Sequence, residues 1–117
     1  MGQADFVLGN PTMVDHTPSG ADVAAGQVIV NDTTPMVAHN KIVDGRLGSL
    51  SIGGGVYKVT AAGSYVVGDL VYWDDSADKV TTSASGNMIF GKMAEASTGD
   101  GDTALAYHMP IALAVGS

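Results

Sequence analysis

The chain has 117 residues, no cysteine, and twelve acidic against five basic residues, which gives a formal net charge of −7. This length is typical of one domain with one modest core. The lack of cysteine excludes a disulfide framework, a thiolate zinc site and a thiol nucleophile. The basic residues are scattered singly, so binding to nucleic acid or to an anionic membrane is disfavoured.

The hydrophobic fraction of 45% is too high for a disordered chain, yet no apolar run reaches the ~20 residues of a membrane-spanning helix. The first residues lack the basic start and apolar stretch of a signal peptide. We therefore expect a protein that is made in the cytoplasm and used without export.

The residue mix favours strands over helices. Valine, threonine and isoleucine are abundant, there are 16 glycines, and the chain has a single glutamate. Glycine recurs about every ten residues, which is typical of the turns of an all-β domain.

The first eleven residues differ from the rest of the chain. A short apolar stretch at 4–8 is separated from the body by Gly9-Asn10-Pro11. It is either the first strand of the core or an extended arm that adds a strand to a neighbouring subunit or partner. We assign 1–11 to an N-terminal arm and 12–117 to a single all-β domain. The candidate residues of the arm for contact with a partner or a neighbouring subunit are Ala4, Phe6, Val7 and Leu8.

The middle of the chain contains short apolar segments joined by turn-forming residues. The glycine run at 53–55 is expected to turn the chain between two strands, and the aspartate-rich segment at 74–78 is expected to form a hairpin turn. The strands are predicted at 27–31, 35–39, 47–52, 56–61, 70–73, 79–82 and 87–95.

The strand at 70–73 is apolar on both faces, whereas a strand of a small sandwich or barrel usually has one wet face. Either it is covered on both sides within the domain, or another subunit covers one face. The candidate subunit-interface residues are Leu70, Tyr72 and Trp73.

From Thr103 onward, large and small side chains alternate with period two, which predicts strands with the large set on one face. Pro110 predicts a break, so we expect two short strands there. His108 falls among the small residues, and we expect it at a surface or interface. In total, about nine or ten short strands and no helix predict a small compact β-barrel or β-sandwich.

Catalytic and cofactor motifs are absent from the sequence. The three histidines have no metal-ligand spacing, the aspartate cluster lacks the pattern of a calcium loop, and no glycine run forms a phosphate-binding loop or a serine-hydrolase motif. We therefore expect no enzyme activity, no catalytic residue, no metal site and no cofactor.

Several segments together resemble the small decoration, or cement, proteins of tailed-bacteriophage capsids. The resemblance covers roughly residues 12 to 110, and the motifs that carry it are turns and strand pairs. They lie at 14–20, 23–30, 44–50, 55–59, 68–75, 79–82 and 85–91.

The resemblance implies a structural protein that binds the outer surface of the assembled head and stabilises it by bridging subunits of the major capsid protein. It also implies an all-β fold and self-association, with a homotrimer favoured and a dimer possible. The expected location is the outer capsid surface of the virion. Some members of this family carry a recombinase label, which this chain does not support because it lacks an ATP-binding loop and a basic surface. The segment after Met109 looks longer than the usual ending, and we expect it to add a strand or to contact a neighbour.

Two other functions are open at this point. One is a virion-surface β-module that binds a receptor or glycan, which would need aromatic side chains at loop tips. The other is a structural component of the head–tail junction or of the tail.

Overall fold

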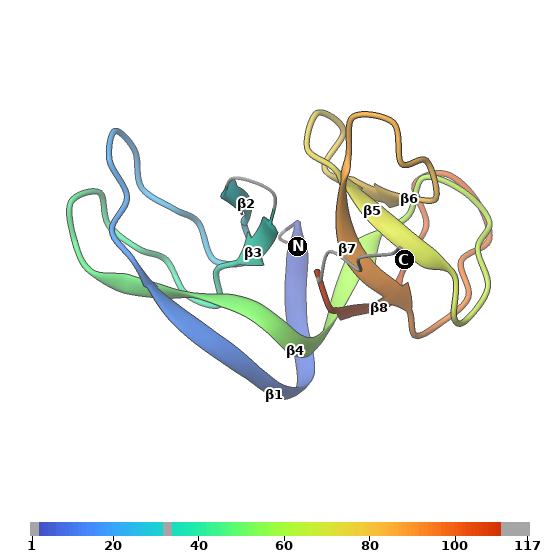
Figure 1. Cartoon of the computed structure of the whole chain (residues 1–117), viewed down its shortest axis with the longest axis horizontal. Helices are drawn as coiled ribbons and strands as arrows, with labels where there is room; N and C mark the ends of the chain where they lie inside the picture. The colour runs from blue at the N-terminus through green and yellow to red at the C-terminus, as the bar shows by residue number, and fades with distance from the viewer. Residues whose placement is uncertain (1–2, 32–33, 111–117) are drawn as a thin grey trace, which may run out of the picture.

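The computed structural model describes residues 3–31 and 34–110, and all regular structure within these ranges is β-strand (Figure 1). The all-β prediction is confirmed, with eight strands described in place of nine or ten. The strands are β1 (Ala4–His16), β2 (Val28–Asn31), β3 (Thr34–Val37), β4 (Gly48–Thr60), β5 (Leu70–Asp74), β6 (Lys79–Thr81), β7 (Met88–Met93) and β8 (Thr103–His108).

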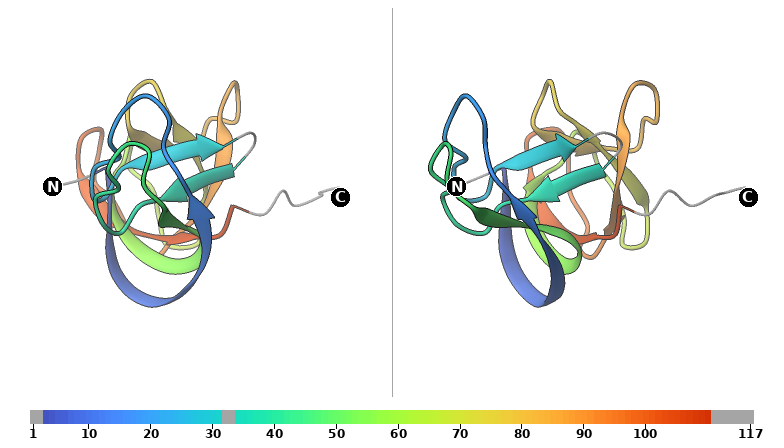
Figure 2. Two further views of the ribbon diagram at one scale, coloured as in Figure 1. Left: turned by 90° about the vertical axis from the view of Figure 1, so that its left-hand side faces the viewer. Right: turned by 60° about the vertical axis from the view of Figure 1, so that its left-hand side comes forward.

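The strands form one curled antiparallel sheet. Its order is β2-β3-β4-β8-β7-β5-β6, and β1 pairs with β4 off this path. The sheet curls until β6 returns to the end of β4, where Ala61 and Val80 form an isolated bridge. On the other side of the molecule, β1 and β4 run together as a long ribbon, and the β2–β3 hairpin lies across the inner side of its bend (Figure 2).

The glycine run at 53–55 does not turn the chain, which corrects the sequence prediction. It lies inside β4, a single strand of 13 residues. Gly53 and Gly54 have φ values of 155° and 103°, which side chains rarely allow, so the strand bends there without reversing. One bent strand therefore replaces the two that were expected. It pairs with β1 along its length, with β3 before the bend and with β8 after it.

The alternation in β8 is confirmed as a strand signal, but the small side chains face the interior and the large ones face outward. The small set, Ala104 and Ala106, is buried together with His108, while Leu105 and Tyr107 point outward. The large aromatic side chains of the other strands occupy the interior, which leaves room only for alanine at two of the three buried positions of β8. The segment from 111 onward, where the second short strand was expected, lies outside the described residues.

One type of turn recurs before five of the eight described strands. In the turn before β5, the amide of Asp69 donates to the carbonyl of Val66 over 3.1 Å, and Gly68 at the third position has φ 95°. This is the arrangement of a type II turn, which requires positive φ at that position. The same bond recurs at 24–27, 43–46, 84–87 and 99–102, ahead of β2, β4, β7 and β8.

The buried hydrophobic residues form two clusters. The first, here called the barrel core, lies inside the curled sheet and contains the largest buried side chains, Tyr57, Trp73 and Phe90. The second, here called the distal cluster, lies between the loops at the far end of the ribbon and consists of Val23, Ala38, Ile42 and Leu50. Because β4 contributes residues to both clusters, it connects the two ends of the molecule.

Candidate interaction surfaces

The N-terminal segment is part of the sheet and forms an edge strand. Residues 4–9 pair with the second half of β4, and residues 12–16 pair with the first half. The register shifts between Gly9 and Thr12, at the place where the arm was expected to end. The opposite edge of β1 pairs with no other strand in the described part of the chain. The division into an arm and a domain stays a prediction.

The four arm residues differ in accessibility. Ala4 is buried in the barrel core, and its amide donates to the carbonyl of Gly26 over 2.8 Å. Phe6, Val7 and Leu8 are exposed to 42%, 44% and 56%. A second register shift lies between Phe6 and Leu8, so the strand has a bulge at Val7 that breaks the regular pleat. The exposed apolar surface of this segment therefore comes from three consecutive residues.

Phe6 also covers a polar contact that the sequence did not indicate. Its ring stacks on His39 with centroids 4.6 Å apart, and Nε2 of His39 forms a 2.5 Å hydrogen bond with the hydroxyl of Tyr57. Burial lowers the pKa of His39 and raises the pKa of Tyr57, so both groups are held neutral near pH 7. No sequence pattern could have found this pair, because the β3–β4 connection and the bend in β4 bring the two side chains together.

The three interface candidates in β5 lie on opposite faces of the strand. Trp73 is 1% exposed in the barrel core, and its Nε1–H donates to Oδ1 of Asp75 over 3.1 Å. Leu70 and Tyr72 lie on the other face of β5 and are partly exposed. Trp73 is thus packed in the barrel core, whereas Leu70 and Tyr72 present surface on the other face of β5. The assignment of these residues to a subunit interface stays a prediction.

His108 is fully buried, which corrects the expectation of a surface or interface histidine. Its ring packs 4.8 Å from Phe90, and its Nε2–H donates to the carbonyl of Pro35 over 2.6 Å. Its Nδ1 has no hydrogen-bond partner among the described residues. Burial is the main cause that lowers the pKa of His108 to about 4; the bond to Pro35 opposes this shift, and the nearby charge of His39 adds to it.

The aspartates of the acidic segments are used within turns. Oδ1 of Asp74 accepts hydrogen bonds from the amide and hydroxyl of Ser76, and Asp100 pairs with Lys79 at 2.8 Å. The prediction of a hairpin turn between β5 and β6 is confirmed. Among the described residues, no three histidine, aspartate or glutamate side chains gather in a group that could hold a metal ion, and no helix could span a membrane.

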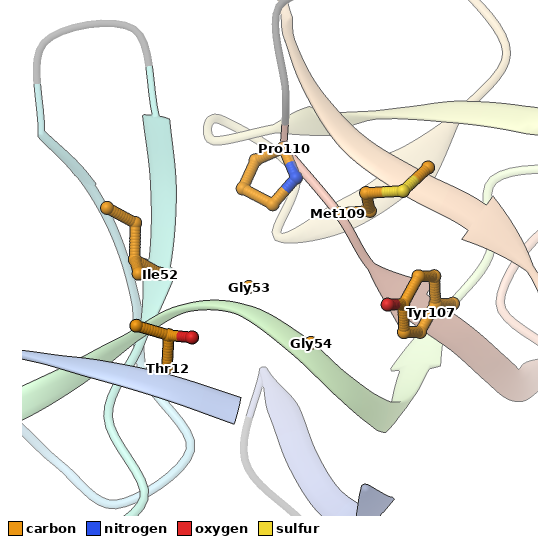
Figure 3. A pocket seen from close by; sticks show the side chains of 7 residues that line it. All are labelled: Thr12, Ile52, Gly53, Gly54, Tyr107, Met109 and Pro110. Atoms are coloured by element: carbon orange, nitrogen blue, oxygen red, sulfur yellow. The ribbon is translucent and has the colours of Figure 1, made fainter. Parts of the chain in front are cut away.

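An apolar groove of about 340 Å³ opens where β8 separates from β4 (Figure 3). The backbone of the β4 glycine run forms its floor, and Pro110 approaches the position that a Cβ on Gly53 would take to within 3.5 Å. None of the lining residues carries a charge. They are Thr12, Ile52, Gly53, Gly54, Tyr107, Met109 and Pro110.

The comparisons with known proteins place this chain in a family. No curated protein and no solved structure matches it. A family model described as phage cement protein matches residues 9–108, which is most of the chain. Such proteins are structural components associated with the phage capsid, in agreement with the all-β body and the turn motifs described above. The chain belongs to the phage cement protein family.

Proposed function

We propose that this protein binds the outer surface of the assembled phage head and stabilises it by bridging adjacent subunits of the major capsid protein. In this proposal the outer edge of β1 makes the capsid contact, and the protein acts as a homo-oligomer, with a trimer favoured. The observation that carries the proposal is an edge strand with three consecutive exposed apolar residues in a member of the cement protein family.

An open strand edge is suited to binding an extended segment of another protein. Backbone N–H and C=O groups at such an edge can form a ladder with an added strand, and adjacent side chains then add apolar contact area. Phe6, Val7 and Leu8 supply that area next to the edge. Because β1 is held to β4 by ten paired positions, the edge is already rigid before binding. Little conformational entropy is therefore lost when a partner strand adds.

Self-association would multiply this contact. A trimer carries three β1 edges on one rigid body, so weak docking at one capsid subunit raises the effective concentration at the next. Separating two capsid subunits would then also require breaking the contacts of the bridging trimer. The net charge of −7 suits a protein that faces solvent outside a shell and has no affinity for the packaged DNA. Leu70 and Tyr72 stay our candidates for a contact between copies.

The test uses point substitutions, because deleting residues 2–10 would remove half of the β1–β4 pairing and the buried Ala4. Val7→Glu places a charge in the proposed contact, and we expect it to weaken binding to undecorated heads at least ten-fold. Val67→Glu is the matched control, because Val67 is 65% exposed in the loop before β5. We expect it to bind normally.

Binding would be measured by co-sedimentation with heads, and head stability by thermal disruption with and without bound protein. Equal binding of the Val7→Glu and Val67→Glu variants would remove β1 from the contact. Failure of the unmodified protein to bind intact heads, or binding without any gain in head stability, would contradict the cement role itself.

A further inference from the structure

We propose that the groove between β4 and the end of β8 receives residues 111–115 of a second copy of this chain. The inference rests on the self-association in the proposed function and names a contact that would produce it. Three observations carry it: the chemistry of the groove, the composition of the last seven residues, and the path of β8.

The groove is suited to an apolar chain in an extended conformation. Ile52, Tyr107, Met109 and Pro110 supply apolar walls (Figure 3). Gly53 and Gly54 contribute no side chains to the floor, and the ring of Pro110 lies over Gly53. Beside that ring, a chain entering the groove can approach the backbone of β4. A charged or strongly polar ligand would lose its hydration without gaining a charged partner, because none of the lining residues is charged.

The last seven residues of the chain match this groove. Their sequence is Ile-Ala-Leu-Ala-Val-Gly-Ser, without a charged side chain. In an extended conformation Ile111, Leu113 and Val115 lie on one face, and the two alanines lie on the other. Seven residues reach about 23 Å, since an extended chain spans ~3.3 Å per residue, which is enough to cross a contact between two small subunits.

β8 leaves the edge of β4 before its last described residues. β8 pairs with β4 only as far as Tyr107, which faces Val56. Beyond that point it follows β7, and the amide of Met109 donates to the carbonyl of Phe90 over 2.9 Å. In the β7–β8 register, in which Gly91 faces His108, residue 111 would face Met88, the first residue of β7. β7 begins at Met88, so it offers no pairing position beyond residue 111 in this register.

The edge of β4 in the same chain is closed to the segment as well. β3 pairs with β4 at Ser51, the position that residue 112 would face if β8 had continued along β4. β3 closes Ser51 to a segment of a second copy as well, but such a segment does not have to continue from Pro110 of the same chain. It can therefore enter the groove from the open side and cross the glycine backbone at Gly53 and Gly54. Each copy would then both donate a segment and accept one, which closes into a ring or a two-fold pair.

Chemical cross-linking tests which copy fills the groove. The natural chain has no cysteine, so single introduced thiols are unambiguous. Thr12→Cys in one affinity-tagged preparation and Leu113→Cys in an untagged one are mixed and treated with a short bis-maleimide. We expect a cross-linked pair of one tagged and one untagged chain. Ser83→Cys, in an exposed turn away from the groove, is the control and should give at most a trace of this product.

A mixture that cross-links no better than the Ser83→Cys control would overturn the inference. So would a Thr12→Cys/Leu113→Cys double variant that closes within one chain in preference to joining two chains, because the segment would then occupy its own groove.

Two neighbouring substitutions give an independent test by light scattering. Leu113→Asp puts a charge on the face that enters the groove, and Ala112→Asp puts the same charge on the opposite face. We expect the unmodified chain and Ala112→Asp to form oligomers at tens of micromolar, and Leu113→Asp to run as the 11.8 kDa monomer. An unmodified chain that is already monomeric, or a Leu113→Asp variant that stays oligomeric, contradicts the inference. Neither measurement involves capsids, so the capsid-binding role stands or fails separately.

Discussion

The two hydrophobic clusters of this protein are built on different principles. The barrel core is lined with aromatic side chains and contains a buried histidine, and all eight described strands contribute residues to it. The distal cluster consists of four small aliphatic residues held between two loops. Hydrogen bonds to carboxylates join those loops: the amide of Gly20 donates to Asp44, and the amide of Asp44 donates to Asp22, both over 2.8 Å. The comparison teaches that packing holds one end of the molecule, while local polar contacts contribute much of the order at the other.

The largest expected difference between the two regions is their response to acid. In the unfolded chain His108 would titrate near 6.5, whereas in the barrel core its pKa is about 4. As the pH falls, the unfolded chain takes up this proton before the folded chain does. The free energy of unfolding is therefore highest above about pH 6.5 and decreases between pH 6.5 and pH 4. The loss amounts to about 3 kcal/mol, since each pKa unit corresponds to ~1.4 kcal/mol.

Urea unfolding at pH 7, 5.5 and 4.5 measures this loss. His108→Gln keeps a donor for the Pro35 carbonyl and cannot titrate, so most of the slope should disappear, leaving a smaller contribution from His39. The bond from the Asp44 amide lowers the pKa of Asp22 in the distal loops, so that carboxylate loses its contribution only below about pH 3.8. A His108→Gln variant with an unchanged slope between pH 6.5 and 4.5 would show that the barrel core does not respond to acid through this residue.

Truncating one valine in each cluster to alanine compares how tightly the two clusters are packed. Val71 in the barrel core is 0% exposed and Val23 in the distal cluster is 4% exposed. We expect Val71→Ala to cost about 2 kcal/mol and Val23→Ala about 1 kcal/mol, because loops can close over a small cavity more easily than a sheet can. Denaturant unfolding gives both values.

Amide hydrogen exchange tests whether the two clusters unfold separately. In the Val23→Ala variant, faster exchange should be confined to the distal loops, including the amides of Val23 and Ile42, which bond each other's carbonyls. Equal costs for the two substitutions, or faster exchange in β5 and β7 as well, would mean that the two clusters unfold as one unit.

The smallest expected effects come from the surface ion pairs. Lys79 and Asp100 lie 2.8 Å apart near the barrel, and Lys41 and Asp22 lie 3.6 Å apart in the distal loops. Exposed pairs contribute about 0.2–1 kcal/mol at most. We expect Lys79→Met to lower the thermal midpoint slightly and Lys41→Met to leave it unchanged, because the second pair is longer and more exposed. A larger loss from Lys41→Met would assign the distal loops a greater electrostatic contribution than their geometry indicates.

Much of the architecture could be predicted from the sequence because the signals were local. The all-β class, the hairpin at β2–β3 and the hairpin at β5–β6 follow from alternating apolar residues between turn-forming ones. The recurring glycine turns were also readable, since a glycine followed by a polar residue precedes strand after strand. The sequence prediction used the frequency of these glycines as a sign of turns, but it did not predict that the turns share one geometry.

The remaining features depend on long-range packing. Whether Gly53-Gly54-Gly55 turns or bends the chain is decided by β1, which pairs with β4 on both sides of the run. Which face of β8 is buried is decided by aromatic residues on other strands. The burial of Trp73 and His108 and the groove beside Pro110 arise in the same way, so no local pattern could have indicated them.

In the proposed bridging role, the β1–β4 ribbon has a mechanical consequence. A tension directed along β1 acts on its ladder to β4 in shear, so all of the paired positions share the load. The same force directed across the ribbon would open the pairs one after another from an end. If the protein bridges capsid subunits as proposed, a pull along the ribbon acts in its stronger direction. β4, which contributes to both hydrophobic clusters, would transmit that force to both ends of the molecule.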